Sequence, residues 1–175
     1  MKRRIRQHST KGFTLIELIV TVVIAGVLAA IAAPSWLSLV NGRRATAGRD
    51  EIMQVLQQTR SEAIRTRQAQ SVSFNTAATP PTVLINSGSA RPIGLDSIQD
   101  QELVNKLGLT VTGSTPTGGV TTITFDDRGN ITTPIGAQGI KLTVSSPPTN
   151  GKKRCVIVQT LLGAMRTVND DNSCN

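Results

Sequence analysis

Residues 12–17 read Gly12-Phe13-Thr14-Leu15-Ile16-Glu17 and open an apolar run that continues to Ala33. Within this run the only charged residue is Glu17. A helix of about 20 apolar residues, each rising about 1.5 Å, spans the hydrocarbon core of a bilayer, which is about 30 Å thick. The run therefore predicts a membrane-spanning helix over residues 13–33.

The charges around this run predict its orientation. Before the run the chain has no acidic residue and five basic ones, namely Lys2, Arg3, Arg4, Arg6 and Lys11. Because cytoplasmic flanks carry an excess of Lys and Arg, we expect residues 1–12 on the cytoplasmic side. Glu17 costs about 2.5–3.5 kcal/mol at a bilayer centre and less near its edge, so its presence indicates a functional carboxylate with a partner.

The residues Lys-Gly-Phe-Thr-Leu-Ile-Glu-Leu at 11–18 resemble the processing site of type IV prepilins and type II secretion pseudopilins. The resemblance implies that prepilin peptidase cleaves between Gly12 and Phe13 at the inner membrane and that the new amine of Phe13 is N-methylated. It also implies that Glu17 neutralises the Phe13 amine of a neighbouring subunit, because opposite charges attract strongly in a low dielectric and are costly to bury alone. An ordinary signal peptide, cut near the small residues 29–33, and a plain single-span anchor are the alternatives, and neither explains Glu17 beside Gly12.

The helical pattern continues past the membrane run. Pro34 predicts a kink and not an end, since a proline inside a helix removes one hydrogen bond and clashes with the preceding turn, yet the pattern resumes at once. Residues 34–69 are therefore expected to form an amphipathic continuation of one helix over about residues 14–69. Asn41-Gly42 and Gly48 weaken its middle and leave a flexible joint open.

Two sets of side chains define the faces of this continuation. The apolar stripe recurs at spacings of three and four residues: Ile52, Val55, Leu56, Thr59, Ala63 and Ile64. The opposite face is expected to hold Arg43, Arg44, Arg49, Asp50, Arg60, Glu62, Arg65 and Arg67. The stripe should pack on the domain that follows.

From Gln70 the pattern changes from helical to alternating, and Val, Ile, Thr, Gly and Ser dominate, which is typical of β structure. Strands are predicted over 70–75, 82–86, 109–112, 120–125, 129–133, 139–145, 154–160 and 161–168, with hairpins around 126–130 and at the end. Residues 98–107 suit either a short helix or an irregular edge. The predicted class is α+β, a long kinked helix packed on a small antiparallel β-sandwich over residues 70–175.

Further motifs resemble the GspH/FimT family of minor pseudopilins and minor pilins. They are Ala33-Pro34-Ser35-Trp36-Leu37, residues 58–64, the stretch Phe125-Asp-Asp-Arg-Gly129-Asn130, residues 154–158 and residues 163–166. The family implies a pilin-like fold, and the C-terminal sequence is most similar to minor pilins of cyanobacterial type. Many members carry Gly-Arg-x-Arg in the last strand, which binds DNA in competence-linked pilins, whereas here Ala164 replaces the first arginine and only Arg166 remains.

The small numbers of cysteine and histidine residues limit which covalent and catalytic chemistry the chain can carry out. Cys155 and Cys174 are the only cysteines, and in an exported domain they are expected to pair and close a loop of about 20 residues, worth about 3 kcal/mol, with free thiols as the alternative. The only histidine is His8, in the leader, so no Ser-His-Asp or Cys-His catalytic pair is expected in the mature chain. No enzyme activity, cofactor or metal is expected. The acidic segments 126–127 and 170–172 are interpreted as turns, with a calcium site as the alternative.

Nucleic-acid binding rests on few residues. The formal charge is +8, but five of the 19 Lys and Arg residues precede Phe13. Lys152, Lys153, Arg154 and Arg166 remain near the end and could attract phosphate. The alternative is a charged strand edge that prevents aggregation, and aromatic side chains for base stacking are absent from this region.

These observations predict a minor pilin that helps to initiate or cap a type IV pilus. The alternatives are a minor pseudopilin of a type II secretion system and a DNA-binding minor pilin for natural transformation. The expected partners are prepilin peptidase, other pilins or pseudopilins in a hetero-oligomeric filament, the inner membrane and DNA. The chain is expected to cross the inner membrane once, with its β domain in the periplasm before assembly.

Overall fold

The computed structural model describes residues 12–94 and 106–174. It divides into two units, Met1–Leu37 and Ser38–Asn175. The helix α1 (Leu15–Thr66) begins in the first unit and continues into the second, which confirms the helix expected over about residues 14–69. Pro34 lies inside α1 and does not end it. The helix stops where Arg67 takes a positive φ of 52°.

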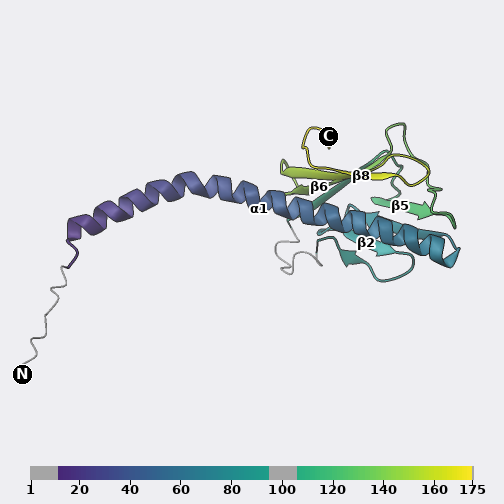
Figure 1. Ribbon diagram of the computed structural model, residues 1–175, viewed down its shortest axis with the longest axis horizontal. Coiled ribbons are helices and arrows are strands. Elements are labelled where there is room, and N and C mark those ends of the chain that lie inside the picture. Colours follow the sequence, from purple (N-terminus) through teal and green to yellow (C-terminus); the bar gives the residue numbers. More distant parts are fainter. Residues whose placement is uncertain (1–11, 95–105, 175) are drawn as a thin grey trace, which may run out of the picture. The chain divides into compact units, whose positions relative to one another are not determined.

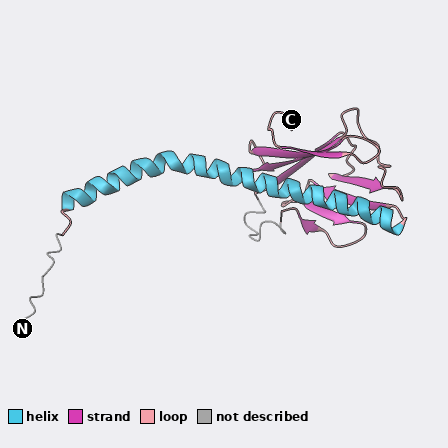
Figure 2. Cartoon of the chain, in the orientation of Figure 1, coloured by secondary structure: helices cyan, strands magenta, loops and turns pink. Residues whose placement is uncertain are grey.

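The second unit contains two four-stranded antiparallel sheets (Figure 1). The first has the order β3-β2-β1-β5 and comprises β3 (Arg91–Pro92), β2 (Thr82–Ile85), β1 (Gln70–Asn75) and β5 (Val120–Phe125). The second has the order β4-β6-β7-β8 and comprises β4 (Gly108–Thr112), β6 (Ile140–Ser146), β7 (Lys152–Val158) and β8 (Met165–Val168). Figure 2 shows these strands in magenta along the later part of α1. The α+β class, with a long helix packed on antiparallel sheets, is confirmed.

Most predicted strands are observed within two residues of their expected bounds, and the last hairpin is formed by β7 and β8. The prediction of a strand over residues 129–133 is wrong. There β5 pairs with β1, and only an isolated bridge joins Phe125 to Ile131. The reason is that the backbone N–H of Ile131 donates to the carbonyl of Leu161 at 2.6 Å, so the ladder with β5 does not continue. The short strand β3 was not predicted. Of the segment expected over 98–107 as a short helix or an irregular edge, residues 98–105 lie outside the described residues.

One hydrophobic core joins the helix to both sheets. Ile52, Val55 and Leu56 of α1 are buried against side chains of the two sheets. Phe74 and Phe125 contribute from the first sheet, and the second contributes Leu142, Val144, Val156 and Val158. The predicted stripe is confirmed at five of its six positions; the sixth, Ile64, has 48% of its surface exposed.

Gly48 has a packing role that the sequence did not reveal. An added Cβ there would lie 3.0 Å from Cγ1 of Val144 and 3.5 Å from Cδ1 of Leu107. The missing side chain therefore lets α1 approach β6 closely. The helix is continuous through Gly42 and Gly48, and close packing accounts for the glycine at 48, whereas an added Cβ at Gly42 would meet nothing within 4 Å.

Two charged residues of α1 are buried, although one of them was expected on the polar face. Arg49 donates hydrogen bonds to Asp50 and to Asn169, which lies just after β8. Glu51 is 3% exposed, and its carboxylate forms an ion pair with Arg91 of β3 at 3.1 Å. The backbone N–H of Gly94 also donates to Glu51. These contacts fasten the β3 segment to the helix, because a buried carboxylate requires donors.

Candidate functional site

The N-terminal residues expected to be processed are exposed. Every residue from Gly12 to Leu39 is exposed, and α1 is long and apolar enough to cross a membrane, with a mean hydropathy of 2.7 over its most apolar window. Within the described part of the chain no hydrogen bond or ion pair engages the carboxylate of Glu17. The structure thus leaves this carboxylate open to a partner outside the chain.

The first turn of α1 also has a local organisation. The side chain of Thr14 accepts a hydrogen bond from the backbone N–H of Glu17 at 3.3 Å, so Thr14 caps the helix one residue before Leu15. Thr14 and Glu17 have the spacing of a capping box, and the negative charge of a carboxylate in the first turn interacts favourably with the helix dipole. This capping signal, Thr-x-x-Glu, was present in the sequence and was missed. It gives Glu17 a helix-starting contribution in addition to any contact between subunits.

The expected disulfide between Cys155 and Cys174 is confirmed, with their Cα atoms 5.7 Å apart. Both cysteines are buried, beside Ile157 and Val168, and strand alternation puts them on the face of β7 opposite Val156 and the main core. The hydroxyl of Thr143 on β6 donates to the carbonyl of Cys174 at 3.1 Å. The disulfide therefore fastens the C-terminal segment across the outer face of the second sheet.

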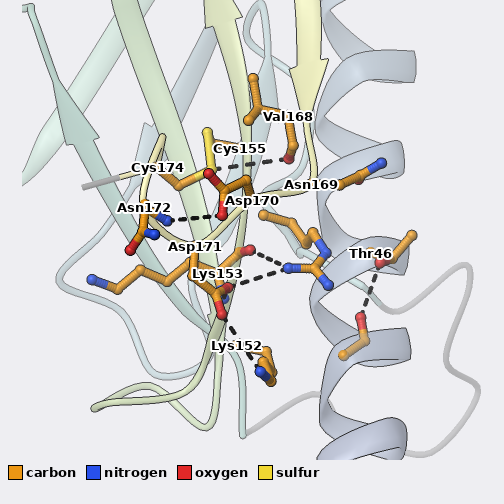
Figure 3. Close-up of polar contacts among 12 residues, drawn as sticks. Thr46, Lys152, Lys153, Cys155, Val168, Asn169, Asp170, Asp171, Asn172 and Cys174 are labelled. Atoms are coloured by element: carbon orange, nitrogen blue, oxygen red, sulfur yellow. Dashed lines mark hydrogen bonds and ion pairs between the residues drawn. A yellow bond between two sulfur atoms is a disulfide. The ribbon is translucent and has the colours of Figure 1, made fainter.

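Asp171 connects this segment to the start of β7 (Figure 3). Its carboxylate accepts hydrogen bonds from the backbone N–H of Lys153 at 2.7 Å and from Nη1 of Arg154 at 3.2 Å. It also lies 3.6 Å from Nζ of Lys152. Two of the basic side chains expected to contact DNA thus share one carboxylate. Nearby, hydrogen bonds from the backbone N–H of Asn172 and the hydroxyl of Ser173 lower the pKa of Asp170.

The four basic residues expected to bind DNA do not form one patch. Alternation along β7 places Lys152 and Arg154 on the side of Val156, toward the helix, and both line a hollow of about 620 Å³ beside Arg43 and Thr46. Lys153 falls on the opposite side of the strand, with Cys155. Arg166 pairs with Ile157 and so shares that opposite face. The structure thus divides them between two faces of the second sheet, with two residues on each face.

A further site, which was not predicted, is organised by Arg60. Its guanidinium donates from Nε to the carbonyl of Gly129 at 3.1 Å, from Nη1 to that of Gly163 at 3.2 Å and from Nη2 to that of Leu162 at 3.1 Å. Arg60 therefore joins α1 to the turn after β5 and to the turn between β7 and β8. No periodicity in the sequence could place an arginine against two distant turns.

The turn after β5 is built around Asp126. Its carboxylate accepts hydrogen bonds from the backbone N–H groups of Asn130 at 2.7 Å and Arg128 at 2.9 Å, and from the side-chain amide of Asn130 at 3.0 Å. The backbone hydrogen bond from Asn130 is the main cause that lowers the pKa of Asp126. This is the solvated turn expected for the acidic pair. In the described ranges no group of three or more His, Cys, Asp or Glu side chains is arranged to hold a metal ion.

Comparison with known proteins identifies the family. The family model described as type II transport protein GspH matches residues 49–162, and the prokaryotic N-terminal methylation motif matches residues 7–33. The chain belongs to the GspH family. It is a pilin-like structural subunit, of the kind that includes minor pilins and pseudopilins, and its family and fold are those of structural proteins.

Two crystal structures of the type IV minor pilin FimU from Pseudomonas aeruginosa (strain PAO1) align with this GspH-family chain. The structure in space group P65 has a TM-score of 0.46 and 15% identity, covering 70% of this chain and 91% of FimU. The structure in space group P21 has a TM-score of 0.48 and 15% identity, covering 76% of this chain and 96% of FimU. No curated protein matches the chain in sequence.

The region matched by the GspH family model contains Arg60 and two of the residues whose carbonyls it binds, Gly129 and Leu162. The match ends one residue before the third, Gly163. Three of the motifs that carried the family resemblance, within residues 58–64, 125–130 and 163–166, thus meet at Arg60, although they lie up to 103 positions apart. Membership of this family and the N-terminal motif imply processing by prepilin peptidase, assembly with other pilins and anchoring by the apolar helix.

Proposed function

We propose that this chain is a minor pilin that helps to initiate or cap a type IV pilus. The observation that supports it best is the exposed apolar surface from Phe13 to Leu39, which begins near Glu17, whose carboxylate has no hydrogen bond or ion pair among the described residues. Such a surface must be covered by lipid or by other apolar helices, because apolar groups leave water favourably. A filament of packed helices supplies that cover after the subunit leaves the membrane.

Processing at the N-terminus supplies the partner for Glu17. In this proposal prepilin peptidase removes residues 1–12, and the new amine of Phe13 is methylated. The amine of one subunit then pairs with Glu17 of its neighbour, since each charge alone is costly in an apolar environment. Intact-mass measurement of the protein from its own host tests this step, with the mature chain expected to begin at methylated Phe13.

The location follows from the same division of the chain. Residues 13–33 cross the inner membrane once, with Pro34 as the expected kink, and residues 34–69 continue the helix. Residues 70–175 form the periplasmic domain, which becomes part of the filament surface. Cys155 and Cys174 suit this compartment, because disulfides form and persist in the periplasm.

In this proposal the subunit acts where a filament starts or stops, either as an initiator or as a cap. An initiator and a cap make different predictions. Loss of an initiator should reduce the number of pili at unchanged length, whereas loss of a cap should change their length.

A second candidate function is that of a minor pseudopilin in type II secretion. It is favoured by the matched family model, whose description is a type II transport protein. The two functions share processing, membrane insertion and helix packing, and differ in the partner subunits. DNA binding is not proposed as a function, because the expected basic residues divide between two faces and two of them form ion pairs with Asp171.

Deletion of the gene, with complementation, tests these functions. Surface pili, DNA uptake and release of secreted proteins are scored separately in the deletion strain. We expect lost or fewer pili with normal secretion. Unchanged pili together with lost secretion would reject the proposal in favour of the second candidate.

A further inference from the structure

Most of the large apolar side chains that are exposed on the second unit belong to two neighbouring segments. Among its described residues, the large hydrophobic side chains that are exposed are Leu39, Ile64, Leu161 and Leu162. Three of these four belong to the two segments that Arg60 joins, namely the end of α1 and the turn between β7 and β8. Leu162 is 71% exposed and Leu161 54%, in the turn between β7 and β8. Ile64 lies one helical turn after Arg60, close to Gly129. We name Arg60, Ile64, Leu161 and Leu162 the Arg60 surface.

The backbone beneath the Arg60 surface is fixed by hydrogen bonds. Arg60 holds the carbonyls of Leu162 and Gly163, and the carbonyl of Leu161 accepts from Ile131. The turn is closed by a hydrogen bond from the backbone N–H of Gly163 to the carbonyl of Thr160 at 3.0 Å. Exposed leucines on an ordered turn lose little freedom when a partner covers them, which favours binding.

The charge of Arg60 is not neutralised within the described part of the chain. All its hydrogen bonds go to backbone carbonyls, and no carboxylate there forms an ion pair with it. The guanidinium borders an open hollow of about 410 Å³, which is also lined by Gln57, Ser61, Ile64 and Arg65. Arg65 already pairs with Glu62 at 2.6 Å, so the excess positive charge at this hollow comes from Arg60. A carboxylate is the group that a guanidinium binds best in protein interfaces.

We propose that the Arg60 surface docks a different pilin subunit of the same filament, through an apolar patch on that subunit with a carboxylate at its edge. The inference rests on the proposed function and adds the surface and the chemistry of the partner. Arginine and clustered apolar side chains are the usual source of binding energy in protein interfaces. A nucleic acid would gain little here, because exposed leucines do not bind phosphate and the surface has no aromatic side chain for stacking.

The first experiment measures binding by the full chain in detergent. The probes are the other pilin subunits of the same filament system, each purified in detergent with a tag, and this chain itself with a second tag. Leu161→Ser with Leu162→Ser should weaken binding of one subunit about tenfold or more. Thr110→Ser with Thr112→Ser is the control, since both side chains are exposed on the edge strand β4, outside the Arg60 surface and outside the apolar part of α1, and should leave binding unchanged.

The second experiment tests the charge of the partner at one position. Leu162→Asp and Leu162→Arg remove the same apolar side chain and add opposite charges beside Arg60. With a carboxylate on the partner, Leu162→Asp should weaken binding more than Leu162→Arg, and the difference should shrink as salt is raised. Equal losses, or a larger loss for Leu162→Arg, would overturn the charge assignment.

The remaining outcomes are also decisive. Binding of no subunit, or binding that survives loss of both leucines, overturns the docking surface. Self-association that depends on the two leucines overturns the choice of partner in favour of a second copy. Binding of labelled duplex DNA that depends on them overturns it in favour of a nucleic acid. Failure of the proposed function is distinguishable, because it is scored by pili and secretion in cells and not by binding in detergent.

Discussion

Arg60 donates a hydrogen bond from Nη1 to the carbonyl of Gly163 at 3.2 Å and thereby joins residues 103 positions apart. The same side chain holds Gly129, so one guanidinium fixes two turns against α1. A lysine has one ammonium group and cannot reproduce this planar set of donors. The contact thus depends on arginine itself and not only on its charge.

Arg60→Lys should therefore lower the free energy of unfolding by about 2–3 kcal/mol, the cost of losing hydrogen bonds made by a charged group and leaving carbonyls unpaired. Denaturant unfolding of the full chain in detergent measures the loss. Arg128→Lys is the control, since the Arg128 side chain is exposed and makes no hydrogen bond among the described residues. Equal stability of the two variants would show that the Arg60 contacts contribute little.

Gly129→Ala should also destabilise the protein. Gly129 has a φ of +79°, and an added Cβ would lie 2.8 Å from Cδ1 of Ile64 and 3.1 Å from Nε of Arg60. Gly118→Ala is a control that separates the two causes, because Gly118 has a φ of +61° but open space around it. The backbone strain of about 1–2 kcal/mol should be common to both, so the excess loss in Gly129→Ala measures the crowding at Arg60. If the losses match, crowding is absent.

Removal of the disulfide should cost about 3 kcal/mol, because the bond between Cys155 and Cys174 restricts a loop of about 20 residues in the unfolded chain. The variant with Cys155→Ser and Cys174→Ser should lose the same stability as the reduced wild type. Protease digestion should then trim the C-terminal segment that follows Val168. Resistance of this segment in the variant would mean that Asp171 and Asn169 are sufficient to hold it.

The turn at Asp126 predicts a pH dependence. Its folded pKa lies below the ordinary value of 3.8, so its contribution to stability is present above that pH and is lost as the pH falls through the folded pKa. Wild type should be more stable than Asp126→Asn near neutral pH, and the difference should shrink below about pH 4. Thermal unfolding at a series of pH values measures it. A difference that stays constant down to pH 2 would exclude Asp126 as its source.

Glu17→Val separates the two contributions of Glu17. The variant should still be cleaved and inserted, because the apolar run is unchanged, but should enter filaments poorly for lack of a partner for the Phe13 amine. The measurement is the ratio of the subunit in sheared filaments to that in membranes. Thr14→Val is the control for helix capping, as it removes the cap and keeps the carboxylate. Normal incorporation of Glu17→Val would show that the pairing is not required here.

The secondary structure of this protein was largely predictable because it depends on local patterns. The spacing of Ile52, Val55 and Leu56 defined the buried face of α1, and alternation from Gln70 defined β1 at its observed bounds. The prediction was wrong over residues 129–133, where a local turn signal was correct but the strand was not. There the N–H of Ile131 bonds to Leu161, a distant residue, and local alternation contains no information about such a partner.

By itself the sequence predicted the membrane run, the long helix and the change to β structure, because these follow from hydrophobic length and periodicity, which are properties of the chain alone. Its N-terminal residues carried the resemblance to a prepilin processing site, and its two cysteines favoured a disulfide that the structure contains. Only the tertiary structure decided that Arg60 joins two turns, that Glu51 is buried and paired with Arg91, and that the basic residues of β7 and β8 divide between two faces. These depend on which strands pair and which faces meet, because long-range packing decides where a charge finds its donors and acceptors.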